Sequence, residues 1–273
     1  MNSGAMSWSV RRELWENRSI YLAPLIVAVM IAFASLVATL TGRHSRPDQI
    51  PKNYEFAAGT LMATTLIVAI FYCLDALYGE RRDRSVLFWK SMPVSDWTAV
   101  LSKMAVPLVV LPVITFAITI ATQLIMLLTT SAFLSMKGQS AAALWNLPWL
   151  QMTSGLFYHL ITVHSLYYAP IFGWLLLVSA WAKRLPFLWA FLPPAAIAVI
   201  EKIVFNTSHL ATTLGARISG GMEVGPAAGG MTMMPWPSHP LEFLTRSGLW
   251  IGLAVAAGCV AGAVRLRRLR DPM

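Results

Sequence analysis

Charged residues are scarce in this chain of 273 residues. They make up 12% of the sequence, whereas soluble domains carry about 25%, and 57% of the residues are hydrophobic. Cysteine is scarcer still, because the only two, Cys73 and Cys259, both lie inside apolar runs and indicate neither a disulfide framework nor a metal site. The composition therefore predicts an all-α integral membrane protein.

The sequence also lacks the common signatures of catalysis. It contains no G-x-x-x-x-G-K-[ST] phosphate-binding loop, no Ser-His-Asp string and no cluster of metal ligands. We therefore predict a protein that is not itself an enzyme and carries no cofactor or metal. The net charge of +9 would suit nucleic-acid binding, but the basic residues lie at the ends of apolar runs, which argues against a nucleic-acid partner.

Six apolar runs are long enough to cross a bilayer, which takes about 20 residues. We expect these six transmembrane helices at about residues 20–40, 57–77, 104–128, 154–182, 187–205 and 247–264. Pro107 and Pro112 are expected to kink the third span. A Gly-rich outer segment, 206–246, separates the last two spans, and its sequence leaves open whether it re-enters the membrane.

Residues 1–19 precede the first span and alternate apolar and charged side chains at helical spacing. On a helical wheel Trp8 and Trp15 fall in one half, and Glu13 and Glu16 fall in the other. This pattern predicts an amphipathic helix that lies in the membrane interface.

The distribution of basic residues predicts the orientation. Most of the 21 Lys and Arg residues lie before the first span, between spans two and three, between spans four and five, and after the last span. These segments share one side of the membrane if there are six spans. The positive-inside rule then places both termini in the cytoplasm.

The segment 78–103 is the most informative stretch, because it is a charged interruption between two apolar runs. Pro93 divides it into two short pieces, since the residue before a proline is pushed out of helical geometry. Ser85 is a plausible N-cap of the first piece, and Ser95 of the second, with Asp96 in the first turn. These features predict a compact helical loop on the cytoplasmic face. A solvated loop whose arginines only fix the topology is the alternative.

Residues 78–103 resemble the first cytoplasmic loop of ABC-2 type transporter permeases. In that family an acidic residue and a basic cluster close span two, a short coupling helix and a proline turn follow, and Ser/Thr-Lys leads into span three. This chain matches those parts with Glu80, the predicted helix 84–92, Met92-Pro93-Val94-Ser95 and Ser102-Lys103. The opening, with Arg12-Glu13-Leu14, is similar to the interfacial entry helix of the family.

The resemblance implies a permease subunit of an ATP-driven exporter in a bacterial inner membrane, with ATP and Mg held by a separate ATP-binding subunit. It also implies a permease homodimer or a pair of permeases. The loop 78–103 would be the coupling element, and the residues expected to contact the ATPase subunit are Glu80, Arg81, Arg82, Arg84, Phe88, Trp89, Lys90 and Pro93.

Four residues inside the spans form a possible intramembrane polar site: Glu201, Lys202, His159 and His164. Intramembrane charges are usually paired or functional. The two histidines are five residues apart, or roughly 140° around a regular helix, so they are not expected to bind one metal together. We therefore favour polar packing or a substrate route for them, and a structural role for Glu201 and Lys202.

Two other function classes remain open at this point. The first is a membrane enzyme acting on lipid-like substrates, with Glu201, His159 and His164 as acid/base groups. The second is a secondary transporter driven by ions through Glu201 and Lys202. The scarcity of clustered intramembrane acids and of convergent catalytic groups disfavours both.

Overall fold

The computed structural model describes residues 3–41, 50–85, 94–138, 140–218 and 242–269, and within these ranges every regular element is a helix. The helices of the first half are α1 (Ser3–Glu16), α2 (Ser19–Leu40), α3 (Ile50–Ala76), α4 (Tyr78–Arg82), α6 (Asp96–Ala105), the π-helix η2 (Val106–Val110) and α7 (Leu111–Met136). Those of the second half are α8 (Ala142–Trp145), α9 (Trp149–His159), the π-helix η3 (Leu160–Tyr167), α10 (Ala169–Trp181), α11 (Pro186–Phe205), α12 (His209–Ile218), α13 (Glu242–Thr245) and α14 (Ser247–Leu269).

Five of the described helices are long and apolar enough to cross a membrane: Ser19–Leu40, Pro51–Arg82, Asp96–Met136, Pro186–Phe205 and Ser247–Leu269. A sixth candidate is a bent pair, Trp149–Tyr167 and Ala169–Trp181, whose two halves meet at 44°. The prediction of an all-α chain with several apolar helices of spanning length is confirmed. The fourth run, which the sequence placed at about residues 154–182 as one span, is this bent pair and not one straight helix.

The bend has a local cause. Pro170 lies near the start of α10 and cannot donate a backbone hydrogen bond to the preceding turn. The preceding residues form the π-helix η3, and the amide of Tyr168 donates to the carbonyl of Val163, five residues back. The chain therefore changes direction at Tyr168.

Pro107 and Pro112 have a different effect. Residues 96–136 form one helical stretch, and the π-helix η2 lies between α6 and α7 with Pro107 near its start. A π-turn shifts the hydrogen-bond register, which accommodates a residue that lacks an N–H. The two prolines produce a local π-segment, and α6 and α7 remain part of one long candidate span.

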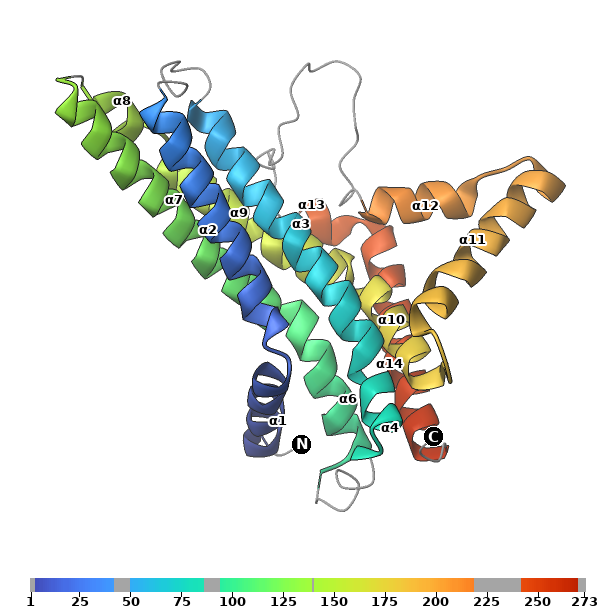
Figure 1. The fold of residues 1–273 in the computed structure, drawn as a ribbon. Helices are drawn as coiled ribbons and strands as arrows, with labels where there is room; N and C mark the ends of the chain where they lie inside the picture. The colour runs from blue at the N-terminus through green and yellow to red at the C-terminus, as the bar shows by residue number, and fades with distance from the viewer. Residues whose placement is uncertain (1–2, 42–49, 86–93, 139, 219–241, 270–273) are drawn as a thin grey trace.

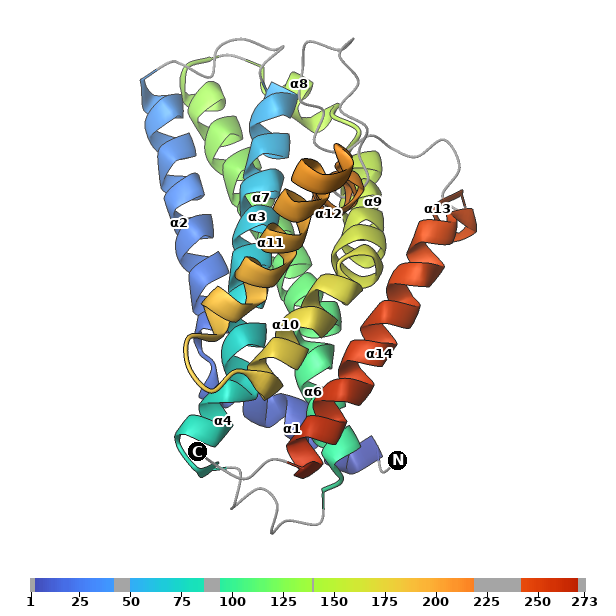
Figure 2. The same cartoon turned by 90° about the vertical axis from the view of Figure 1, so that its right-hand side faces the viewer.

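The bundle is arranged so that α1, α4, the start of α6 and the end of α14 lie at one end, together with both chain termini (Figure 1). We call this the lower end, as it is drawn in Figure 1. In the view of Figure 2, α1 runs across the lower end at a steep angle to α2. Trp8 and Trp15 of α1 are exposed, 60% and 66%, whereas Glu13 is 1% exposed. The helix predicted at the N-terminus therefore exists, with Glu13 directed toward the protein and Glu16 exposed.

The helices α10 and α14 pack closely against each other. A Cβ added at Gly173 would lie 3.2 Å from the Cα of Ala256, a tight contact with backbone, so a side chain at this position would push the two helices apart by a few tenths of an ångström. Small residues allow helices to pack tightly where lipid provides no hydrophobic drive for association. This contact fixes α14, and with it the arginines at its end, against the bundle.

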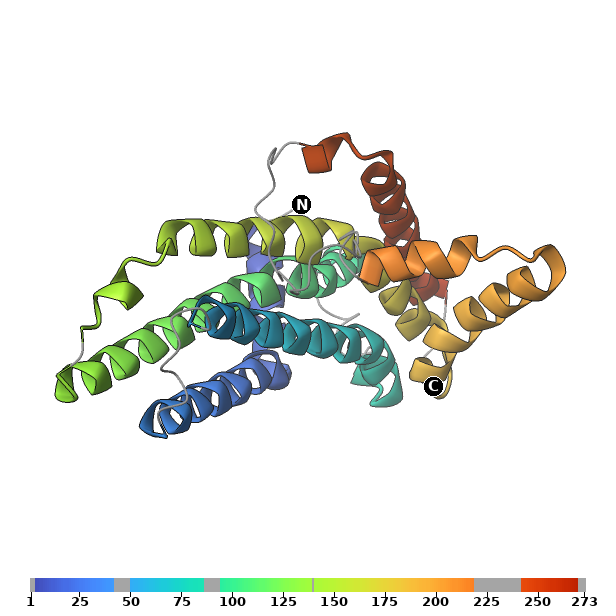
Figure 3. The same ribbon diagram turned by 90° about the horizontal axis from the view of Figure 1, so that it is seen from above.

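The helices α11 and α12 form an arm that projects from the bundle (Figures 1 and 3). The bounds of α11, Pro186–Phe205, agree with the predicted span 187–205. Only Ala190 of α11 is buried, so most of this helix faces outward from the chain.

Candidate functional site: a buried charge cluster at the lower end of the bundle

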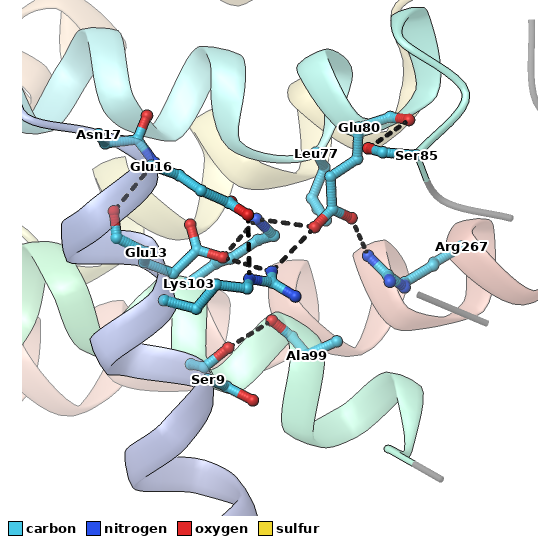
Figure 4. Close-up of polar contacts among 12 residues, drawn as sticks. Ser9, Glu13, Glu16, Asn17, Leu77, Glu80, Ser85, Ala99, Lys103 and Arg267 are labelled. Carbon is cyan, nitrogen blue, oxygen red and sulfur yellow. Dashed lines mark hydrogen bonds and ion pairs between the residues drawn. The ribbon is translucent and has the colours of Figure 1, made fainter. Parts of the chain in front are cut away.

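Charged side chains from four helices meet in a buried cluster at the lower end (Figure 4). The members are Arg12 and Glu13 of α1, Glu80 of α4, Asp96 and Lys103 of α6, and Arg267 of α14. Three cations face three carboxylates, so the formal charge is balanced. Because directly bonded members such as Glu80 and Arg267 lie 187 residues apart in the chain, the cluster is a product of the tertiary fold.

Lys103 is the centre of the cluster. Its Nζ lies 2.8 Å from Glu13 Oε1 and 3.2 Å from Glu80 Oε1, and its side chain is 2% exposed. Figure 4 shows the ammonium directed toward both carboxylates. A buried ammonium loses its hydration, and this arrangement replaces water with two charged acceptors. Lys103 therefore links α6 to both α1 and α4.

Arg12 joins the same two carboxylates from the side of α1. Its Nη2 lies 2.8 Å from Glu13 Oε1 and 3.2 Å from Glu80 Oε1. The hydroxyl of Tyr72, on α3, donates to the second oxygen of Glu13 at 2.9 Å. Both oxygens of the Glu13 carboxylate thus have donors, as a nearly fully buried carboxylate requires.

Arg267 connects the last helix to the cluster. Its Nη1 donates to Glu80 Oε2 at 2.6 Å, and its Nε donates to Asp96 Oδ1 at 3.2 Å. Arg267 is 8% exposed, although it belongs to the basic run that ends the chain. A residue that the sequence suggested as a topology signal is therefore a buried structural contact between α14, α4 and α6.

The turn between α3 and α4 positions Glu80. The hydroxyl oxygen of Ser179, on α10, accepts the amides of Leu77 and Tyr78 at 3.0 and 2.9 Å. Arg81 Nη2 donates to the carbonyls of Ser179 and Ala182 at 2.6 and 2.8 Å. These bonds fasten the start of α4 to the end of α10, so that Glu80 points into the cluster.

Ser95 positions Asp96, the carboxylate of the cluster that lies at the start of α6. Its side chain accepts the amide of Thr98 at 3.2 Å, which confirms the predicted N-cap and places Asp96 in the first turn of α6. Asp96 is thereby set opposite Arg267. Val100 and Met104 of α6 are buried, whereas Trp97 is 42% exposed.

The electrostatics of Glu13 follow from its partners. Burial alone would raise the pKa of this carboxyl, but Lys103 and then Arg12 oppose that effect and hold the pKa below its ordinary value. Glu16, one turn further on α1, shows the reverse: burial is the largest influence, and the pKa is raised. Glu13 therefore keeps its charge in the cluster.

The structure divides the predicted coupling residues into two groups. Glu80 and Arg81 are buried and bonded within the chain, whereas Arg82 and Arg84 are exposed, and Arg82 Nε lies 3.0 Å from Asp83 Oδ1. Phe88, Trp89, Lys90 and Pro93, together with the helix proposed after Ser85, lie outside the described residues.

Sequence reasoning did not place Glu13, Lys103 and Arg267 in one site. Glu13 appeared in a helical-wheel pattern and a short family motif, Lys103 in a short family motif, and Arg267 only among the basic residues after the last span. The available signal was an isolated charge at the edge of an apolar run, and it gave no information on which charges would meet.

Glu201 and Lys202 do not act together. Glu201 Oε1 accepts the amide of His209 at 2.6 Å, and Oε2 accepts the amide of Leu210 at 2.9 Å, so the carboxylate caps the first turn of α12. Lys202 is exposed, and no ion pair involves it within the described part of the chain. Glu201 is thus structural, without Lys202 as its partner.

The two histidines lie closer together than a regular helix allows. Residues 160–167 form the π-helix η3, in which hydrogen bonds run from residue i to residue i+5, and the rings of His159 and His164 have centroids 5.6 Å apart. The angle of roughly 140° between them therefore does not apply, because it holds for a regular α-helix. The α11–α12 corner, where Glu201 lies, is at the far end of the arm (Figures 1 and 3), so the three residues proposed for an enzyme do not converge.

Within the described residues no group of three or more His, Cys, Asp and Glu side chains could hold a metal ion. The chain was also compared with protein-family models, with curated proteins and with solved structures, and it matches none of them. The buried charge cluster is therefore the site that the geometry itself identifies.

Proposed function

We propose that this chain is the transmembrane permease subunit of an ATP-driven exporter of the ABC-2 type, with six spans, both termini in the cytoplasm and a separate ATP-binding subunit. The lower end in Figure 1 would then face the cytoplasm of a bacterial cell. The motifs of residues 78–103 suggest the family, and the concentration of basic residues in the segments at this end supports the orientation.

The observation that carries the proposal is the position of the charge cluster around the loop 83–95. Glu80 precedes this loop, Asp96 follows it, and both carboxylates accept from Arg267. A partner that moves the loop therefore moves two helix ends that are joined by buried ion pairs. Since Lys103 and Arg12 extend the connection to α1, the displacement reaches the interfacial helix as well.

A permease needs such a rigid junction. When a soluble subunit closes on ATP, the transmembrane helices move only if the part of the permease that it contacts keeps its own shape. Several buried pairs between four helices resist separation, because each one broken leaves a charge without a partner in a poorly hydrated site. The proposed mechanism is alternating access, in which the junction transmits the movement to α3, α6 and α14.

The experiment that tests the proposal is an affinity purification. The tagged chain is extracted from its native membrane in mild detergent, and the proteins that accompany it are identified. We expect a stoichiometric soluble subunit with an ATP-binding cassette. Replacing Phe88 and Trp89 by alanine is expected to release it, because large aromatic side chains dominate protein interfaces.

A matched control uses two exposed aromatic residues at the opposite end of the bundle. Phe56 and Trp145 are 64% and 56% exposed, and replacing both by alanine removes side chains of the same kinds. The partner should remain bound to this control. Absence of any ATP-binding subunit in several detergents would refute the proposed function, and equal loss from both double variants would refute the role of the loop.

A further inference from the structure

The helix α1 has an exposed face that carries aromatic and cationic side chains. Trp8, Arg11 and Trp15 are all exposed, and their spacing of three and four residues places them on one side of the helix. Glu13 lies on the opposite side and is buried in the charge cluster. One side of α1 is therefore fastened to the protein, and the other is left uncovered by the described part of the chain.

The position of α1 places this exposed face near a membrane surface. The helix ends at Glu16, and α2, the first candidate span, begins only three residues later at Ser19. Figure 2 shows α1 running across the lower end at a steep angle to α2. A helix that adjoins the start of a span and runs across it lies at the level of the lipid headgroups.

The two tryptophans fit that environment better than they fit water. Trp8 and Trp15 are each more than half exposed. An indole combines a large apolar body with one N–H donor, and tryptophan is accordingly enriched where the hydrocarbon of a bilayer meets water. The exposed face of α1 therefore has the aromatic component of an interfacial contact.

The arginines on this side of α1 lack a carboxylate partner. Arg12 turns toward the protein and pairs with Glu13 and Glu80, whereas Arg11 and Arg18 are exposed and form no ion pair within the residues that the structure describes. The guanidinium carbon of Arg11 lies 5.1 Å from the centroid of the Trp15 ring, which holds the cation beside the indole without neutralising it. The exposed face thus carries positive charge that the protein itself does not balance.

The chemistry of these groups selects a lipid phosphate as the counter-charge. A guanidinium donates two parallel hydrogen bonds to a phosphate, and basic side chains at a membrane surface are attracted to anionic lipids. Neighbouring indoles anchor the helix at the same depth. We propose that the exposed face of α1, together with Arg18, binds the headgroups of anionic phospholipids.

Headgroup binding would act on the charge cluster as well. Arg12 and Glu13 lie between Arg11 and Trp15 in the chain, so the lipid and the cluster hold the same turn of α1 from opposite sides. A ligand that binds only the docked helix stabilises the docked state. The content of anionic lipid therefore sets how firmly α1 is held. This inference rests on a membrane location of the chain and does not require an ATP-binding partner.

The test is amide hydrogen exchange of the full-length chain in membranes of two compositions. One contains phosphatidylcholine alone, and the other contains phosphatidylcholine mixed with the anionic phosphatidylglycerol. Each basic side chain near an anionic surface contributes about fivefold to binding, so exchange in α1 should be roughly tenfold or more slower in the mixed membrane. Equal exchange in the two membranes would overturn the proposal.

Two double variants show whether the effect belongs to α1. Arg11→Gln with Arg18→Gln should abolish the slowing by phosphatidylglycerol. The matched control is Lys183→Gln with Arg184→Gln, which removes two exposed cations from the turn between α10 and α11 and should leave the slowing intact. Equal loss in both double variants would mean diffuse attraction and no site on α1.

A soluble anion separates a lipid surface from a phosphate site. Glycerol phosphate, which carries the phosphate without acyl chains, is added to the protein in phosphatidylcholine alone. It should leave exchange in α1 unchanged, because it supplies no interface for Trp8 and Trp15. Slowing equal to that given by phosphatidylglycerol would overturn the assignment to lipid.

Discussion

Lys103 Nζ lies 2.8 Å from Glu13 Oε1, and the two side chains are only 2% and 1% exposed. The pair joins α6 to α1, whose Trp8 and Trp15 side chains face away from the protein. It is a polar contact between elements that the sequence places 90 residues apart. This buried ammonium therefore holds α1 in position, together with the contacts of Arg12 to Glu80 and of Tyr72 to Glu13.

Removing that ammonium should release α1. Lys103→Met leaves Glu13 and Glu80 with fewer cations, and breaking a buried pair costs about 3–5 kcal/mol. We expect lower thermal stability in detergent and faster proteolysis after Arg11 or Arg12. Glu13→Gln combined with Lys103→Met should cost less than the sum of the single changes, and strictly additive effects would contradict direct coupling.

Arg267 should be essential to the buried charge cluster, whereas Arg265 should not. Arg267→Met removes the partner of Glu80 Oε2 and of Asp96, so a loss of about 2–5 kcal/mol is expected. Arg265 is exposed, and Arg265→Met should change stability by less than about 0.5 kcal/mol. Thermal unfolding of the two purified variants makes the comparison. Equal effects would mean that the ion pairs of Arg267 contribute nothing.

The stability that Glu13 gives to the buried charge cluster should be lost in acid. The pKa of Glu13 in the folded protein is below its ordinary value of 4.5, so its stabilisation is present above that value and is lost as the pH falls through the lowered pKa. Unfolding midpoints measured between pH 7 and pH 3 should fall less steeply in Glu13→Gln.

Glu16→Gln is the matched control for the acid experiment. Glu16 lies on the same helix, but its pKa is raised, chiefly by burial, so its contribution has the opposite sign. The steep loss below pH 4.5 should persist in this variant. If Glu16→Gln reduced the fall of the unfolding midpoint at low pH as much as Glu13→Gln does, this fall could not be attributed to Glu13.

Ser179 should be needed to hold α4. Its hydroxyl oxygen accepts the amides of Leu77 and Tyr78, and Ser179→Ala would leave both without that acceptor in a buried turn. The expected cost is about 1–3 kcal/mol. The control is Thr60→Ala, because the hydroxyl of Thr60 only donates to a carbonyl of its own helix. Amide hydrogen exchange at residues 77–82 should accelerate in the first variant and not in the second.

Substitutions at Glu201 and Lys202 should differ in their effect on stability. Glu201→Ala removes the cap of α12 and is expected to lower the thermal unfolding midpoint, with faster amide exchange at His209 and Leu210. Lys202→Met should have little effect on stability, since Lys202 is exposed. A destabilised Lys202→Met protein would show that the two residues form a pair after all.

The sequence by itself determined the local features of this protein. The run 187–205, which is apolar except for Glu201 and Lys202, predicted α11 within one residue at its start, because about 20 mostly apolar residues are long enough to form a spanning helix. Ser95 was identified as an N-cap for an equally local reason, since its hydroxyl reaches an amide three residues away. The amphipathic N-terminal segment predicted α1.

Only the tertiary structure decided which polar groups meet. The pairing of Glu13 with Lys103, and of Glu80 with Arg267, depends on how four helices cross at the lower end, which no local pattern encodes. His159 and His164 approach because η3 is π-helical, whereas spacing on a regular helix separates them. Helix formation is a property of neighbouring residues, but charge pairing in a bundle follows from packing over distances of about a hundred residues along the chain.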